Sequence, residues 1–150
     1  MTSFERALAF VLQPAIEGGY VNNPADPGGA TNEGVTQREY SAWRREGGHP
    51  AQDVKDLTPN KRNAVYFDDY WQAAGCQSIA WPLCLVQFDT AVNCGVQRAK
   101  GFLAASGGDV HAYLKKRRSY YLSLVAIRPG LKVFLKGWLN RMDLLEREVG

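Results

Sequence analysis

The sequence predicts a single, mainly α (α+β) domain of about six or seven helices, with a small β-hairpin-like loop after the first helix. Apolar residues recur every three or four positions along most of the chain, which is the period of an amphipathic helix. Capping residues precede these segments, and glycine or proline follows them. One stretch near the N-terminus lacks the helical period and is rich in turn residues, which predicts the loop.

Length and composition favour one folded domain. The chain has 150 residues, of which 45% are apolar and 22% are charged, and this supply of core residues argues against disorder. The formal net charge of +3 is too small to indicate a nucleic-acid partner. The longest apolar run, 79–86, has eight residues and contains Pro82, so we expect no stable membrane insertion.

The first expected helix begins after Thr2, which forms a capping-box pattern with Glu5. The glycines at 18–19 should end it, after a kink or an irregular turn at Pro14. The stretch 20–35 that follows is expected to form an ordered loop or short hairpin. It is the part of the chain where we expect β structure.

Capping residues and helix breakers place the remaining helices. We expect them from Thr36 to Gly47, from Thr58 to about Trp71, from Pro82 to near Gly95, through Phe102 and Leu103, from Asp109 to Pro129, and from Leu131 to Val149. No repeat, low-complexity segment or flexible linker separates them, so 1–150 is predicted to be one domain.

Two features indicate where the chain is made. The apolar stretch 7–12 lacks a basic segment before it and a cleavage site after it, so no signal peptide is expected and the chain should be cytoplasmic when made. Cys76, Cys84 and Cys94 cannot all pair with one another, and we interpret them as free, mostly buried thiols.

The candidate chemistry lies around the N-terminal loop. Glu17 is expected at the C-terminal end of the first helix, where the helix dipole and burial raise the pKa of a carboxyl group towards the range of a general acid. An exposed, inert glutamate at a helix end is the alternative. If the loop folds back, Asp26 and Thr31 converge on Glu17 and add an ionised carboxylate and a hydroxyl that orients water. This trio fits hydrolysis of a glycosidic bond.

Several motifs in this order resemble the family 108 glycoside hydrolases, which are phage-type N-acetylmuramidases. They are Glu17-Gly-Gly-Tyr20, Asp26-Pro-Gly-Gly-Ala-Thr31, Asn32-x-Gly34-Val-Thr36, Tyr70-Trp71, Phe88-Asp-x-Ala-Val-Asn93-x-Gly95 and Gly137-Trp-Leu-Asn-Arg141. The resemblance covers nearly the whole chain, from about residue 3 to residue 147.

The resemblance implies a lysozyme-like fold with a cleft running past Glu17, the catalytic acid. The Glu-Asp-Thr spacing is also similar to that of phage lysozymes whose site lies beside a small β-hairpin, so Asp26 and Thr31 complete the catalytic set. The spacing between Asp26 and Thr31 is one residue shorter than in those lysozymes, which leaves Asn32 or Thr36 as alternatives to Thr31. A catalytic half of about 1–95 and a peptidoglycan-domain-like half of about 96–150, not independent of it, are expected.

Substrate binding is expected of Tyr20, Asn32, Thr36 and Asn93. Tyr20 can stack on a sugar, and the amide of Asn93 can donate to and accept from an N-acetyl group, although a polar helix end is an equally good interpretation of Asn93.

Two basic features leave alternatives open. Arg141 either pairs with a buried carboxylate such as Asp89 or holds substrate. The run Lys115–Arg118 is interpreted as a solvated face, with attraction to an anionic wall or outer-membrane surface as the alternative.

Other ways of cutting a bacterial wall fit the residues less well. His49 and His111 are the two histidines, they lie far apart, and neither belongs to a zinc-binding or cysteine-protease motif, so no metal and no cofactor is expected. The expected partner is peptidoglycan, without nucleic acid, and the chain should be a monomer.

The resemblance also implies a biological setting. It implies a phage endolysin that acts in the periplasm or cell wall after holin-type release from the host cytoplasm. The alternative is a wall-binding or secretion-assisting protein of the same family with little or no turnover.

Overall fold

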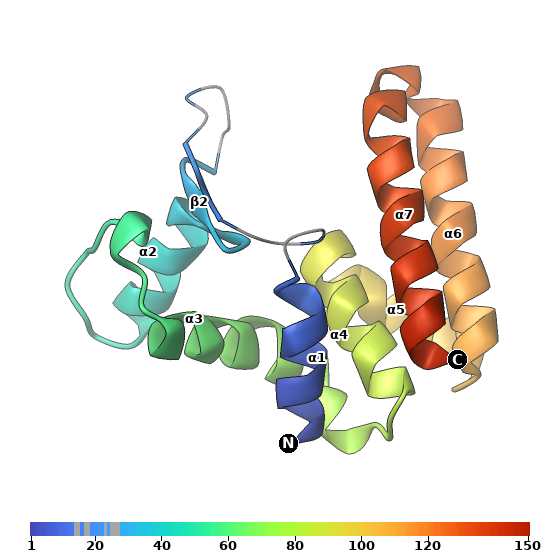
Figure 1. Ribbon diagram of the computed structural model, residues 1–150, viewed down its shortest axis with the longest axis horizontal. Helices are drawn as coiled ribbons and strands as arrows, with labels where there is room; N and C mark the ends of the chain where they lie inside the picture. Colours follow the sequence, from blue (N-terminus) through green and yellow to red (C-terminus); the bar gives the residue numbers. More distant parts are fainter. Residues whose placement is uncertain (14–15, 17–18, 23, 25–27) are drawn as a thin grey trace. The chain divides into compact units, whose positions relative to one another are not determined.

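The computed structural model describes residues 1–13, 16, 19–22, 24 and 28–150 (Figure 1). Contacts between backbone positions divide the chain into two compact units, Met1–Gln72 and Ala73–Gly150. Over the described residues there are seven α-helices and one three-stranded antiparallel sheet, which confirms the mainly α class with a small β element. The organisation as a single domain stays a prediction.

Helix α1 spans Ser3–Val11 and begins with the expected capping box. It ends well before the predicted end at 18–19. Pro14 has no amide hydrogen to donate to the carbonyl of Phe10, and a residue that precedes proline avoids helical dihedral angles. The expected helix is therefore shorter at its C-terminal end than predicted. Glu17 lies outside the described residues, so its role stays a prediction.

The sheet consists of β1 (Tyr20–Val21), β2 (Thr31–Asn32) and β3 (Val35–Thr36), in the order β1-β2-β3. Glu33 and Gly34 connect β2 to β3 and have φ angles of +50° and +82°. Two successive positive φ angles are typical of the type I′ turn, whose twist matches that of the strands it joins. The expected hairpin-like loop is confirmed, and it gains a third strand.

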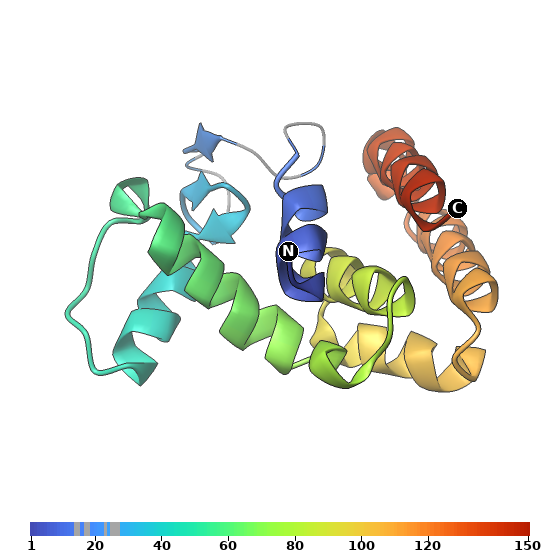
Figure 2. The same cartoon turned by 60° about the horizontal axis from the view of Figure 1, so that its bottom comes forward.

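Four helical segments complete the first unit, which can be followed in Figure 2. Thr36 and Thr58 accept hydrogen bonds from backbone amides at the starts of α2 and α3, as their positions in the sequence predict. The last turn of the expected helix 58–71 is wider than an α-helix. The segments are α2 (Gln37–Glu46), the 3₁₀ turn η1 (Val54–Asp56), α3 (Pro59–Tyr66) and the π-helix η2 (Phe67–Gln72).

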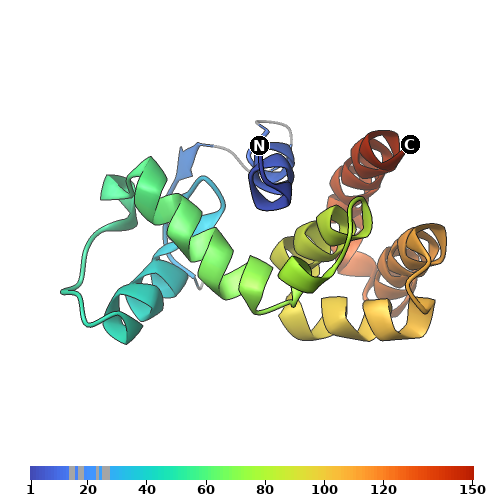
Figure 3. The same ribbon diagram turned by 90° about the horizontal axis from the view of Figure 1, so that it is seen from below.

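The regular secondary structure of the second unit is entirely helical (Figure 3). Each helix expected there is present, and Gly95, with a φ of +97°, separates α4 from α5. Helices α6 and α7 run side by side as a hairpin (Figure 1). The elements are η3 (Cys76–Ser78), α4 (Leu83–Cys94), α5 (Val96–Ser106), α6 (Val110–Ile127), η4 (Pro129–Leu131) and α7 (Lys132–Val149).

Helix α4 forms the core of the second unit and carries polar as well as apolar buried residues. Gln87 is fully buried and satisfies its amide by accepting from the Tyr113 hydroxyl at 2.7 Å and donating to the Ala74 carbonyl at 3.1 Å. Cys76 and Cys84 are buried and form no disulfide, as expected. None of the described helices is both long and apolar enough to cross a membrane.

Candidate active site

The predicted site residues fall into three groups. Glu17 and Asp26 lie outside the described residues. Asn93 belongs to the second unit. The others are in the sheet of the first unit: Tyr20, Thr31, Asn32 and Thr36.

The register of the sheet decides which of these side chains share a face. Residues directly opposite each other on antiparallel strands point to the same side, and successive residues alternate. One face therefore carries Tyr20, Asn32 and Val35, and the other carries Val21, Thr31 and Thr36.

The face with Asn32 packs against the rest of the first unit. Val35 on this face is fully buried. The Asn32 Nδ2 group donates to the carbonyl of Val54 at 2.9 Å and to that of Lys55 at 3.4 Å, which ties the hairpin to η1. Tyr20, at the edge of the sheet, is 42% exposed and accessible for stacking.

The opposite face brings two hydroxyl groups together. Thr31 lies directly opposite Thr36, which places their Cβ atoms about 4.5–5.5 Å apart. The Thr36 oxygen accepts from the Glu39 amide at 3.1 Å, so its hydroxyl hydrogen remains to be donated. Val21 on the same face is 59% exposed. Of the three alternatives for a water-orienting residue, Thr31 and Thr36 share this face and Asn32 lies on the other.

The β2–β3 turn is held by three anchors. Glu33 has a positive φ, which is costly for a residue with a side chain unless its surroundings fix it. Its amide donates to the Gly19 carbonyl at 2.7 Å, its carbonyl accepts from the Tyr66 hydroxyl at 2.7 Å, and its carboxylate pairs with Arg62 at 2.5 Å. The contacts with Tyr66 and Arg62 fix the hairpin to α3. In the sequence, the only local signal for this arrangement is Gly34.

Glu39 is a largely buried carboxyl group in the first turn of α2 that was not among the predicted site residues. Its carboxylate accepts a hydrogen bond from the Tyr70 hydroxyl. Burial raises the pKa of Glu39 to about 7, with the charge of Asp69 acting in the same direction and the Tyr70 hydrogen bond opposing both. Tyr70 belongs to one of the motifs that resemble family 108, and its hydroxyl donates to a carboxyl group whose pKa is about 7.

Asn93 is oriented by a hydrogen-bond chain in the second unit. Arg117 Nε donates to the Tyr121 oxygen at 3.0 Å, and the Tyr121 hydroxyl donates to Asn93 Oδ1. The Cys94 thiol lies 3.4 Å from the same Oδ1 atom. Because these groups occupy the amide oxygen, a ligand that binds to Asn93 would accept hydrogen bonds from its Nδ2 group.

This series of hydrogen bonds starts from Arg117, which belongs to a buried ion cluster around Asp89 of α4. Asp89 Oδ2 lies 2.7 Å from Arg117 Nη1, and Asp89 Oδ1 lies 2.8 Å from Arg141 Nη2. Burial by itself raises the pKa of Asp89, but Arg141 and Arg117 together hold it below its usual value. The interpretation of Arg141 as the partner of Asp89 is confirmed.

Arg117 corrects one expectation. The run Lys115–Arg118 was expected to form a solvated face, but the Arg117 side chain is fully buried. The signal in the sequence was Asp89, a carboxylate within the apolar run of α4 that requires a buried cation.

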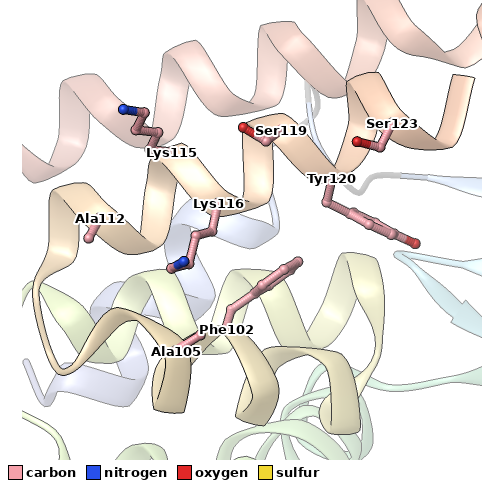
Figure 4. Close-up of a pocket in the computed structure, with 8 residues that line it drawn as sticks. All are labelled: Phe102, Ala105, Ala112, Lys115, Lys116, Ser119, Tyr120 and Ser123. Atoms are coloured by element: carbon pink, nitrogen blue, oxygen red, sulfur yellow. The ribbon is translucent and has the colours of Figure 1, made fainter. Parts of the chain in front are cut away.

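A groove of about 710 Å³ lies between α5 and α6 (Figure 4). None of the predicted site residues lines it. Its walls are Phe102, Ala105, Ala112, Lys115, Lys116, Ser119, Tyr120 and Ser123. Within the part of the chain that the structure describes, no cluster of three or more His, Cys, Asp or Glu residues is arranged to hold a metal ion.

Comparison with known proteins establishes the class of protein. The family model of glycosyl hydrolase 108 matches residues 9–95, a span that contains every predicted catalytic and substrate-binding residue. The chain belongs to this family of glycoside hydrolases, and the membership supports a role in peptidoglycan hydrolysis.

The fold comparison agrees with the family. The chain is similar to a solved structure described as "Structure of Brucella abortus SagA", with a TM-score of 0.79 and 26% sequence identity, over 98% of this chain and 93% of that one. The mainly α, lysozyme-like fold is confirmed. No curated protein gives a significant match.

Proposed function

We propose that the protein is an N-acetylmuramidase that hydrolyses the β-1,4 bond between N-acetylmuramic acid and N-acetylglucosamine in peptidoglycan. The observation that carries the proposal is the family 108 match over residues 9–95, together with the sheet inside that span. In the sequence, β1 begins three residues after Glu17, and β2 begins with Thr31, five residues after Asp26.

Each catalytic residue has a separate task in this reaction. Glu17 donates a proton to the glycosidic oxygen as the bond to the sugar carbon breaks. Asp26 stabilises the positive charge that develops on the sugar ring or takes a proton from the attacking water. The Thr31 hydroxyl orients this water, and its position next to the Thr36 hydroxyl, on the face opposite the buried Val35, supports its choice over Asn32.

Substrate recognition uses the remaining predicted residues. Tyr20 offers an exposed ring for stacking on a sugar, and Asn93 offers its amide hydrogens to the carbonyl of an N-acetyl group. Thr36 and Asn32 bind substrate from the two faces of the sheet, Thr36 through its hydroxyl hydrogen and Asn32 through its amide oxygen, while both also hold the hairpin in place.

We propose phage-mediated host lysis as the biological role. The protein is made in the host cytoplasm and acts as a monomer, without a cofactor, on the periplasmic or cell-wall glycan after holin-type release. The resemblance to phage-type muramidases supports this assignment.

Product analysis tests the proposed reaction. Purified peptidoglycan of defined composition is digested, reduced with borohydride and analysed by mass spectrometry. The proposal predicts fragments with reduced muramic acid at their ends. Reduced glucosamine ends indicate a glucosaminidase, anhydro-muramic ends a lytic transglycosylase, and free peptides an amidase, and each of these outcomes contradicts the proposal. Binding of a folded protein to the wall without any product favours the wall-binding or secretion-assisting alternative.

A further inference from the structure

The second unit has an unusually one-sided charge distribution. Between Thr90 and Met142 there are ten Lys and Arg residues and one acidic residue, Asp109. Three of the ten basic residues are in ion pairs with acidic residues outside this stretch: Arg117, Arg118 and Arg141. The others are exposed: Arg98, Lys100, Lys115, Lys116, Arg128, Lys132 and Lys136.

Exposed apolar side chains gather where α6 turns through η4 into α7. Ile127 is 77% exposed, Val133 79% and Phe134 54%, and Leu122, in the last two turns of α6, is 50% exposed. Exposed apolar patches with a polar rim are typical of sites that contact another surface. Here the rim consists of Arg128, Lys132 and Lys136, so the surface to be contacted carries negative charge.

The groove between α5 and α6 continues this surface along α6. Lys116, Tyr120 and Ser123 line the groove, and Ile127 follows Ser123 by four residues. Residues spaced three or four apart lie on one side of a helix, so the groove and the apolar end share a face of α6. Figure 4 shows Lys116 and Phe102 among the side chains that line the groove, and none of these lining residues carries a carboxylate.

We propose that this surface docks on a bilayer that contains anionic phospholipid. The apolar side chains of Ile127, Val133 and Phe134 enter the boundary between headgroups and acyl chains, and the surrounding lysine and arginine side chains reach the phosphates. A polysaccharide is a poorer fit, because the most exposed apolar side chains, Ile127 and Val133, are aliphatic and sugars stack on aromatic rings. The contact is peripheral and involves no spanning helix.

Vesicle binding tests the proposal independently of hydrolysis. The full chain is sedimented with vesicles of phosphatidylcholine alone or of phosphatidylcholine mixed with phosphatidylglycerol. We expect binding only to the anionic vesicles, weakening as the salt concentration rises, because charge near an anionic membrane surface acts within a Debye length.

Three double variants separate the contributions. Ile127→Ser with Val133→Ser removes exposed apolar area, and Arg128→Gln with Lys132→Gln removes two charges from the rim. Arg45→Gln with Arg147→Gln is the matched control, because it removes the same charge from exposed residues that are not among those of this surface. Each of the first two should weaken vesicle binding by about tenfold or more, and the control should change it by less than about threefold.

The outcomes distinguish membrane docking from general attraction to polyanions. Equal binding to neutral vesicles, or equal losses in the control and the rim variant, would overturn the proposal. The proposal would also be overturned if the protein bound polyglutamate as tightly as vesicles and the Ile127→Ser, Val133→Ser variant bound it equally well. That result would indicate a general polyanion site. Hydrolysis of purified peptidoglycan should be the same for all three variants, so loss of vesicle binding and failure of the muramidase assignment are distinguishable.

Discussion

The buried ion cluster makes Asp89→Asn a decisive change for the stability of the second unit. Asp89 and Arg117 are fully buried, and Arg141 is 7% exposed. The asparagine side chain fits the same space but removes the negative charge that the Arg117 and Arg141 guanidinium groups both contact. Removing one partner of a buried ion pair costs about 3–5 kcal/mol, whereas an exposed pair contributes less than about 1 kcal/mol.

Thermal and urea unfolding measure this cost. At about 2–4 °C per kcal/mol for a chain of this size, the melting temperature should fall by roughly 10 °C. Asp143→Asn is the matched control, because the Asp143 side chain is 53% exposed and pairs with Arg118 on the surface. Equal losses of stability in the two variants would refute the reasoning, because they would mean that burial of Asp89 adds nothing to its ion pairs.

The pH dependence of this contribution has a definite sign. The pKa of Asp89 is lowered in the folded protein, so its stabilisation is present above the unfolded pKa of about 3.9 and is lost as the pH falls through the folded value. Acid unfolding monitored by circular dichroism should therefore begin at a higher pH in a variant that weakens the cluster, such as Arg141→Lys, than in the wild type.

Three further predictions test other parts of the structure. The pKa of Glu39 is raised from 4.5 to about 7 in the folded protein, so its contribution to stability is complete below pH 4.5 and is lost as the pH rises through 7. In urea titrations, the free energy of unfolding of the wild type should therefore fall between these pH values, and Glu39→Gln should abolish this fall. Gly34→Ala should lower the free energy of unfolding by about 1–2 kcal/mol, because Gly34 has a φ of +82° in the β2–β3 turn, and an unchanged urea midpoint would contradict that turn. Tyr121→Phe removes the hydroxyl that fixes the Asn93 oxygen, so KM for glycan should rise several-fold with kcat nearly unchanged, and an effect on kcat alone would argue against a binding role for Asn93.

The fold was largely predictable because local residues, mainly the capping residues, determine where its helices begin. Thr2, Thr36, Thr58 and Asp109 each cap the helix that the sequence assigned to them. The first helix was predicted too long because its apolar period continues past Pro14, and the period does not show that a proline ends a helix instead of bending it. The π-helical turn over 67–72 has no local signal, since it depends on how those residues pack.

The candidate site was predictable in composition but not in arrangement. Family resemblance identified Thr31, Asn32 and Thr36 together, but only strand register shows that Asn32 lies on the opposite face from the two threonines. The partnership of Glu39 with Tyr70 spans 31 residues and leaves no pattern in the local sequence. The burial of Arg117 could have been inferred from Asp89, because a carboxylate within an apolar helix requires a cation.

The most direct test of the catalytic assignment is the rate at which Glu17→Gln hydrolyses purified peptidoglycan. Glu148→Gln, at an exposed position near the end of α7, makes the same chemical change and serves as the control. Because an amide cannot donate the proton of a carboxylic acid, Glu17→Gln should lose at least about a hundredfold in rate while its melting temperature stays the same. If folded Glu17→Gln released reducing ends at the wild-type rate, the assignment of Glu17 as the general acid would be contradicted.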